Sequence, residues 1–136
     1  MSSATIPILR YRDAGAAIDW LCRAFGFQVF LRVEGGPGIE HARLILERNM
    51  IMLASLGRKG RFEQGFTTPR MAGGVTQSVL MIVESPDRLY ESSLAAGAKI
   101  IDEIADFEFG GRLFSCRDIE SHVWAFGSGD PWKKTW

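Results

Sequence analysis

The chain has 136 residues, which is the usual size of one domain and enough to bury a stable core. Its hydrophobic content of 46% is typical of a globular protein, and its 16 basic residues balance its 16 acidic ones. A formal charge of zero argues against nucleic acid or an anionic membrane as partner. No apolar run approaches the ~20 residues of a membrane span, and residues 1–5 do not resemble a signal peptide. We therefore expect a cytoplasmic protein with Cys22 and Cys116 as reduced thiols.

The first half of the chain predicts a strand, a helix and three further strands. Residues 5–11 favour a strand, with Pro7 indicating an edge or a strand start. Asp13 is a candidate N-cap of a helix whose apolar residues follow a helical period. Gly26 stands where a left-handed residue would end that helix. Three strands follow at 27–33, 39–46 and 50–55, separated by turns at 35–38 and 47–49.

The second half repeats this order. A strand is predicted at 76–84, and Ser85 with Pro86 forms a typical helix start. The buried face of that helix is expected to carry Tyr90, Leu94 and Leu89, and Gly97 ends it. Strands follow at 99–104, 112–117 and 122–126, with turns at 110–111 and 118–121. Shifting the second half back by 71 positions lays Val79-Leu80 on Ile8-Leu9.

The repeat predicts a single domain, 1–136, built from two modules. These are module 1–56, a linker at 57–74, module 75–127 and a C-terminal tail at 128–136. The linker shows no periodicity and is either a mobile flap over a site or a simple connector. One module has too small a core to fold alone, so we expect the two to pack together. The expected fold is α+β, with paired βαβββ modules forming a curved mixed sheet around a cavity.

Several motifs stand in the order of a known family. They are Pro7–Ala14, Ala24–Phe27, Gly38–Ala42 and Met50–Leu53 in the first half, and Thr76–Ser78, Ala95–Ala98, Phe109–Arg112 and Asp118 through Gly127 in the second. From about residue 5 to 127 the chain resembles the glyoxalase/bleomycin-resistance group of the vicinal-oxygen-chelate superfamily. The resemblance implies paired βαβββ modules, often in a homodimer. It also implies a choice between metal-dependent isomerases, lyases and dioxygenases and metal-free proteins that sequester antibiotics.

The resemblance also implies where metal ligands would lie. Metal-dependent members take one His or Gln from the first strand of each module and one Glu from each last strand. These positions fall here at Ile6 or Pro7, at Ser78 beside Gln77, near Leu53 and at Ala125. None is a usual ligand, and Gln77 alone would not hold a metal. We therefore expect no metal and no cofactor.

The candidate ligand-binding residues of the cavity are His41, Arg43, Leu53, Ser78, Phe107, Phe109, Arg112 and Ala125. His41 and Arg43 alternate with Ala42 and Leu44, so they are either polar anchors in the cavity or part of a solvated strand face. Phe107 and Phe109 are expected to wall a pocket mouth. Arg112 either faces the cavity or clamps its turn.

For the other aromatic and ionisable residues we mostly expect structural roles. Trp124 and Phe126 are expected to pack under a helix, which leaves Ala125 to shape the cavity. Asp118 and Glu120 are expected to serve the geometry and solvation of their turn, and His122 is expected to be a turn residue and not a catalyst. Trp132 and Trp136 of the tail either dock on the body or a partner or belong to a frayed terminus.

Three functions remain open, and no catalytic residue can be assigned. The first is a metal-free protein that binds a small, partly aromatic molecule, with a homodimer as the expected assembly. The second is a glyoxalase-like lyase or isomerase, or a dioxygenase-related enzyme, whose metal site lies away from the family ligand positions named above. The third is a structural or regulatory partner with a collapsed cavity.

Overall fold

The computed structural model describes residues 2–36, 38–57, 60 and 63–134. The first module consists of β1 (Ile8–Tyr11), α1 (Ala14–Phe25), β2 (Gln28–Gly35), β3 (Gly38–Leu46) and β4 (Asn49–Ser55). The second consists of β5 (Val79–Ile82), α3 (Pro86–Ala95), β6 (Lys99–Asp106), β7 (Arg112–Arg117) and β8 (Val123–Gly127). Both halves therefore have the predicted βαβββ order. Among the described residues, no helix is long and apolar enough to cross a membrane.

The linker contains a short helix, α2 (Pro69–Ala72), that the sequence did not predict. Four residues are too few to show a helical period, so only the caps were available as signals. Thr68 accepts a hydrogen bond from the amide of Met71, and Gly73 closes the turn at a φ of 83°.

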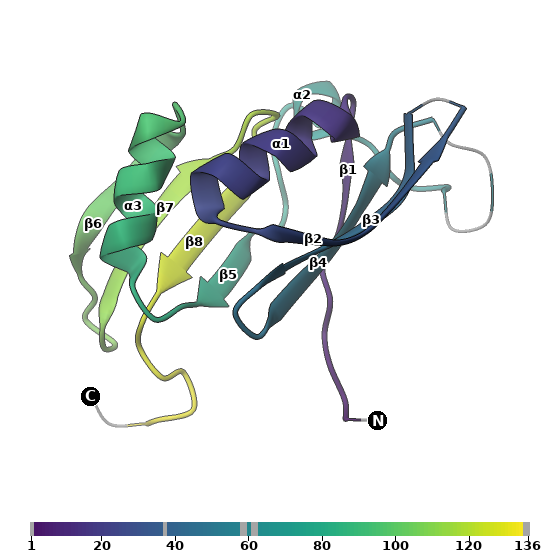
Figure 1. Ribbon diagram of the computed structural model, residues 1–136. Helices are drawn as coiled ribbons and strands as arrows, with labels where there is room; N and C mark the ends of the chain where they lie inside the picture. Colours follow the sequence, from purple (N-terminus) through teal and green to yellow (C-terminus); the bar gives the residue numbers. More distant parts are fainter. Residues whose placement is uncertain (1, 37, 58–59, 61–62, 135–136) are drawn as a thin grey trace.

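The strands form two separate sheets of an α+β fold (Figure 1). The first sheet has the order β1-β4-β3-β2 and the second the order β5-β8-β7-β6. In each sheet the first strand of the module pairs in parallel with the last, and the other pairs are antiparallel. β1 and β5 are thus edge strands, as Pro7 indicated for the first of them.

The predicted helix ends are confirmed. The carboxylate of Asp13 accepts a hydrogen bond from the amide of Ala16, and Gly26 ends α1 in the left-handed conformation. Ser85 caps α3, and Gly97 follows its end at a φ of 85°. The predicted buried face of α3 is wrong at one position, since Leu94 is exposed. Ser93 is buried instead, because its hydroxyl is satisfied by the carbonyl of Leu89 at 2.7 Å.

The repeat does not follow one offset. Leu9 pairs with Leu53 in the core, and Val79 pairs with Trp124 on the same side of the second sheet. The first strands are therefore related by 70 positions, whereas the closing glycines Gly26 and Gly97 are 71 apart. The shift of 71 laid Val79 on Ile8, which turns β5 over, because successive side chains of a strand face opposite sides.

The two modules share one hydrophobic core between their helices. α1 and α3 lie on the same side of the sheets and contact one another. The ring of Phe25, at the end of α1, lies 5.3 Å from Trp124 and 4.7 Å from Phe126, both fully buried in β8. The prediction that Trp124 and Phe126 pack under a helix is confirmed, with the helix supplied by the other module.

Side chains on one turn of each module bind the edge strand of the other. Glu120, in the turn between β7 and β8, accepts hydrogen bonds from the amides of Arg12 at 2.6 Å and Asp13 at 2.9 Å, just beyond β1. Two residues later, the ring Nε2 of His122 donates to the carbonyl of Arg10 at 2.8 Å. The exposed edge of β1 is thereby covered by polar groups of the second module.

The same arrangement recurs with the modules exchanged. Glu47, in the turn between β3 and β4, accepts from the amide of Glu84 at 3.0 and 3.2 Å. Two residues later, the side-chain amide of Asn49 donates to the backbone carbonyl of Ile82, at the end of β5, at 3.2 Å. We call these two sets of contacts the reciprocal locks. Each lock joins the edge strand of one module to a turn of the other, and within the described part of the chain the two sheets share no strand pairing.

Asp118 forms the buried centre of the lock that contains Glu120 and His122. Its Oδ2 accepts from the hydroxyl of Tyr11 at 2.6 Å and from the indole of Trp124 at 2.9 Å. Its Oδ1 accepts from the amides of Glu120 and His122. Burial, followed by the negative charge of Asp118, raises the pKa of Tyr11 well above its usual range, so the phenol remains a donor. The expectation of a solvated turn was wrong, because Asp118 and Glu120 are only 5% and 8% exposed.

Candidate ligand-binding site

Each sheet has one face toward the helices and a second face, here called the open face, away from them. On the second sheet, Met81 lies in the core while its neighbours Leu80 and Ile82 point to the open face and are 53% and 38% exposed. Leu113, next to the buried Phe114, also lies on this face. The open face of the second sheet is therefore apolar at the end where β5 and β8 finish.

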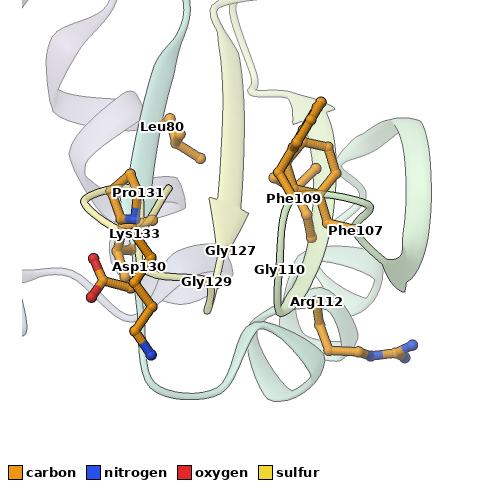
Figure 2. Close-up of a pocket in the computed structure, with 12 residues that line it drawn as sticks. Leu80, Phe107, Phe109, Gly110, Arg112, Gly127, Gly129, Asp130, Pro131 and Lys133 are labelled. Atoms are coloured by element: carbon orange, nitrogen blue, oxygen red, sulfur yellow. The ribbon is translucent and has the colours of Figure 1, made fainter. Parts of the chain in front are cut away.

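A pocket with a volume of about 250 Å³ lies at this end. Figure 2 shows Leu80 and Pro131 on one side of it and the Phe107 and Phe109 side chains on the other, with Gly127 of β8 between them. Its remaining lining residues are Ile82, Gly110, Arg112, Leu113, Gly129, Asp130 and Lys133. All of them belong to the second module or the tail. The pocket is thus formed by one sheet and not by the meeting of two inner faces that the sequence led us to expect.

The aromatic wall comes from the connection between β6 and β7. The amide of Phe107 donates to the carbonyl of Gly111 at 2.8 Å, and the amide of Gly110 donates to the carbonyl of Phe107 at 2.9 Å. This tight turn places the rings of Phe107 and Phe109 in edge contact, 5.3 Å apart and inclined at 73°. Both rings remain partly exposed, at 39% and 50%, so they are available to a ligand.

The opposite wall comes from the start of the C-terminal tail. Ser128 exchanges hydrogen bonds with the backbone of Arg112, which holds the tail against β7. Gly129 passes so close to the turn that a Cβ there would meet the carbonyl oxygen of Gly110 at 2.4 Å, which requires glycine. The chain then turns at Asp130 and places Pro131 beside the pocket, while Trp132 is 90% exposed. Trp136 lies outside the described residues.

Arg112 acts as a clamp at this end of the sheet. Its guanidinium binds Asp87 of α3 at 2.8 Å and Asp106 of β6 at 3.2 Å. Figure 2 shows the side chain directed away from the space between the two walls. The hydrogen bond from Arg112 lowers the pKa of Asp87, and the two carboxylates raise the pKa of Arg112. Of the two roles left open by the sequence, the geometry favours the clamp.

The other candidate residues lie apart from this pocket. His41 and Arg43 lie on the open face of the first sheet, where the Nε of Arg43 donates to the Nε2 of His41 at 3.0 Å. Leu53 instead lies in the core, because its strand pairing turns it toward α1. Ser78 lines a groove between the modules, and Ala125 lies on the open face of β8. The structure thus brings together Phe107, Phe109 and Arg112 but not the remaining five.

The glyoxalase/bleomycin resistance protein/dioxygenase superfamily profile matches residues 4–126. The chain belongs to this superfamily. No curated protein matches it. Among solved structures, the superfamily member TioX from Micromonospora sp. ML1 is 29% identical, with a TM-score of 0.77 over 95% of this chain and 100% of that one.

Two further structures share the superfamily fold at lower identity. A glyoxylase/bleomycin resistance protein/dioxygenase domain from Frankia sp. EAN1pec is 20% identical, with a TM-score of 0.71 over 98% of this chain and 96% of that one. The genomically encoded fosfomycin resistance protein FosX from Listeria monocytogenes is 15% identical, with a TM-score of 0.64 over 96% of each chain.

The strand register allows the metal site of the superfamily's enzymes to be tested. On the open faces, the first strands carry Ile8 and, just before β5, Ser78, while the last strands carry Ala54 and Ala125. Gln77 lies outside β5 and lines the groove between the modules. These side chains do not fit the metal site of the superfamily's enzymes, because none of them supplies an imidazole or a carboxylate. Within the described part of the chain, no three His, Cys, Asp or Glu side chains are grouped to hold one.

The sequence analysis named three of the twelve residues that line the pocket and missed the other nine. Leu80 and Ile82 could have been found, because side chains alternate along a strand. Once Met81 is known to face the core, its two neighbours must lie on the open face of β5. Pro131 and Lys133 carried no signal, because a tail without periodicity does not reveal where it folds back.

Proposed function

We propose that the chain binds a small, largely apolar molecule with a flat aromatic part in the pocket of the second sheet, without a metal. The observation that carries this proposal is the slot between the Phe107–Phe109 pair and the opposite wall of Leu80 and Pro131. Aromatic edges and aliphatic groups on facing walls favour a planar apolar group between them.

The charged groups at the pocket support this ligand class. Arg112 is engaged by Asp87 and Asp106, and the Asp130 carboxylate accepts from the amide of Trp132. Lys133 lies at the rim, on the tail. The two facing walls of the slot offer apolar contact, which favours a ligand whose polar groups remain outside it. Membership of a superfamily that includes metal-free binding proteins agrees with this function.

Substitution of Phe109 by alanine tests the proposal. The neutral fluorescent probe N-phenyl-1-naphthylamine is expected to bind the wild-type protein and to lose about 10-fold in affinity in Phe109→Ala, because an aromatic contact and its buried area are removed. Phe30→Ala is the matched control, since Phe30 is 62% exposed on β2 of the other sheet. Fluorescence titration of the three proteins measures the difference.

Two results would contradict the proposal. Equal probe affinity in Phe109→Ala and Phe30→Ala would place binding elsewhere, and no binding to any of the three would favour a collapsed, non-binding partner protein. Stoichiometric divalent metal in protein purified without chelator would instead support the alternative of a metal-dependent lyase or isomerase.

We further propose that two copies associate through their open faces. The first sheet exposes Ile8 and Val33 there and carries Arg43, whereas the second exposes Leu80 and carries the Asp102 carboxylate. Apolar patches with complementary charges suit an association of the first sheet of one copy with the second sheet of the other.

Ile8→Asp is expected to convert this dimer to a monomer in sedimentation velocity, because a carboxylate would be buried against apolar side chains. Leu94→Asp is the matched control, since Leu94 is 44% exposed on α3. A monomeric wild-type protein, or a dimer that survives Ile8→Asp, would exclude this interface.

A further inference from the structure

A buried arginine on the first sheet is held by the linker between the modules. Arg10 of β1 is 4% exposed and alternates with the core residues Leu9 and Tyr11, so its side chain lies on the open face. Its Nη2 and Nε donate to the two carboxylate oxygens of Glu63, at 2.5 and 3.1 Å. The ring of Phe66 lies 4.2 Å from the guanidinium carbon. We call Glu63 and Phe66 the latch.

The latch shows which groups Arg10 can bind, namely a carboxylate and an aromatic ring. A guanidinium binds a carboxylate through two parallel hydrogen bonds and stacks on an aromatic ring through its planar face. Here one short segment of the linker supplies both groups, a carboxylate and a phenyl ring three residues apart. The position around Arg10 is therefore built for an anion next to an aromatic ring.

We propose that Arg10 is a binding site for aromatic carboxylates, and that the linker keeps this site closed with its own Glu63 and Phe66. The site lies on the first sheet, whereas the pocket of the proposed function lies on the second. The two proposals therefore stand or fall separately.

The latch can open without breaking a sheet. Residues 63–68 belong to no helix or strand, and the three described contacts of the latch with Arg10 are made by side chains. Phe66 also lines the groove between the modules, which has a volume of about 780 Å³ and extends past Leu9 and Ser78. A ligand can thus approach the latch from this groove.

The burial of Arg10 makes the exchange selective. An unpaired buried guanidinium is strongly unfavourable, so Glu63 leaves only when another anion takes its place. A ligand carboxylate preserves the ion pair, whereas a neutral aromatic molecule does not. The tethered Glu63 competes at an effective concentration of about millimolar order, so a simple carboxylate without a ring is excluded.

The test compares benzoate binding to the wild-type protein and to Glu63→Gln. Benzoate is expected to bind Glu63→Gln about 10-fold more tightly, because the tethered competitor has lost its charge. The Nε–H resonance of Arg10 is expected to shift during the titration in nuclear magnetic resonance spectra. Glu91→Gln, on an exposed position of α3, is the matched control and should bind benzoate as the wild type does. Benzamide, the neutral analogue, should bind none of them.

Two outcomes would overturn the inference. One is equal benzoate affinity in the wild type and Glu63→Gln, and the other is an increase that persists in Glu63→Gln/Arg10→Met, in which the positive charge is gone. If Glu63→Gln does not fold, Phe66→Ala carries the test, because it keeps the buried ion pair and removes only the ring. Benzoate should then bind Phe66→Ala about threefold more tightly than the wild type, given the ~0.5–1 kcal/mol of a cation–π contact, and unchanged affinity would contradict the proposal.

Discussion

Replacing Asp118 by alanine is expected to lower the free energy of unfolding by about 3 to 5 kcal/mol, since hydrogen bonds to a charged group contribute about 1.5–3 kcal/mol each. The carboxylate accepts from Tyr11, Trp124 and two backbone amides of its turn. Alanine would leave the hydroxyl and the indole without their acceptor inside the core, where water does not replace it. Urea unfolding followed by circular dichroism and tryptophan fluorescence, at one protein concentration, measures the loss.

The matched control is Asp19→Ala. Asp19 lies on α1 with 76% of its side chain exposed and only a 4.0 Å contact with Arg32, so its loss should change the free energy of unfolding by less than about 0.5 kcal/mol. Tyr11→Phe should fall between the two, because it removes one donor and leaves the carboxylate three others. A loss in Asp118→Ala as small as that in Asp19→Ala would show that the buried carboxylate does not hold the modules together.

Local signals were sufficient to predict the helices and strands of the two modules, but not the short helix α2. Asp13 and Ser85 as N-caps, Gly26 and Gly97 as helix ends, and the turn residues between strands each act within a few residues, and the structure confirms them. The resemblance to the superfamily rested on the order of such motifs, and the match over residues 4–126 confirms it.

The sequence predictions that proved wrong or incomplete concern residues whose positions depend on contacts between distant segments. Asp118 was read as a turn carboxylate because nothing near it in sequence reveals Tyr11, which lies 107 positions away. The tail's part in the pocket was missed because it carries no periodicity that would place Pro131 against the second sheet. Leu53 was chosen from the family's last-strand position, one residue away from Ala54, and a shift of one residue along a strand moves a side chain to the opposite face.

These long-range contacts also explain how the chain combines rigidity with two accessible faces. The shared core between α1 and α3 and the reciprocal locks hold the modules on the helix side and along the edge strands. Neither uses the open faces, so the slot beside Phe107 lies outside the contacts between the modules. Substitutions at exposed pocket residues such as Phe109 are therefore expected to change binding without unfolding the protein.

The two reciprocal locks are expected to differ in their contribution to stability, because the glutamate of one is buried and that of the other is exposed. Glu120→Ala is expected to lower the free energy of unfolding by about 2 to 3 kcal/mol, since its nearly buried carboxylate binds two amides next to the start of α1. Glu47→Ala removes the corresponding contact of the other module, but Glu47 is exposed and water can replace it. Its loss should be less than about 1 kcal/mol. Urea unfolding of both variants provides the comparison.

The correspondence between the two locks identifies a substitution that should leave the free energy of unfolding nearly unchanged. His122 donates to the carbonyl of Arg10 in the position where Asn49 donates to the carbonyl of Ile82. His122→Asn should therefore retain the hydrogen bond and change the free energy of unfolding by less than about 0.5 kcal/mol, whereas His122→Ala should lose about 1 kcal/mol. If asparagine proved as destabilising as alanine, the two turns would not be equivalent. The contact of the His122 ring with Tyr11, at 4.7 Å between centroids, would then be the interaction that matters at this position.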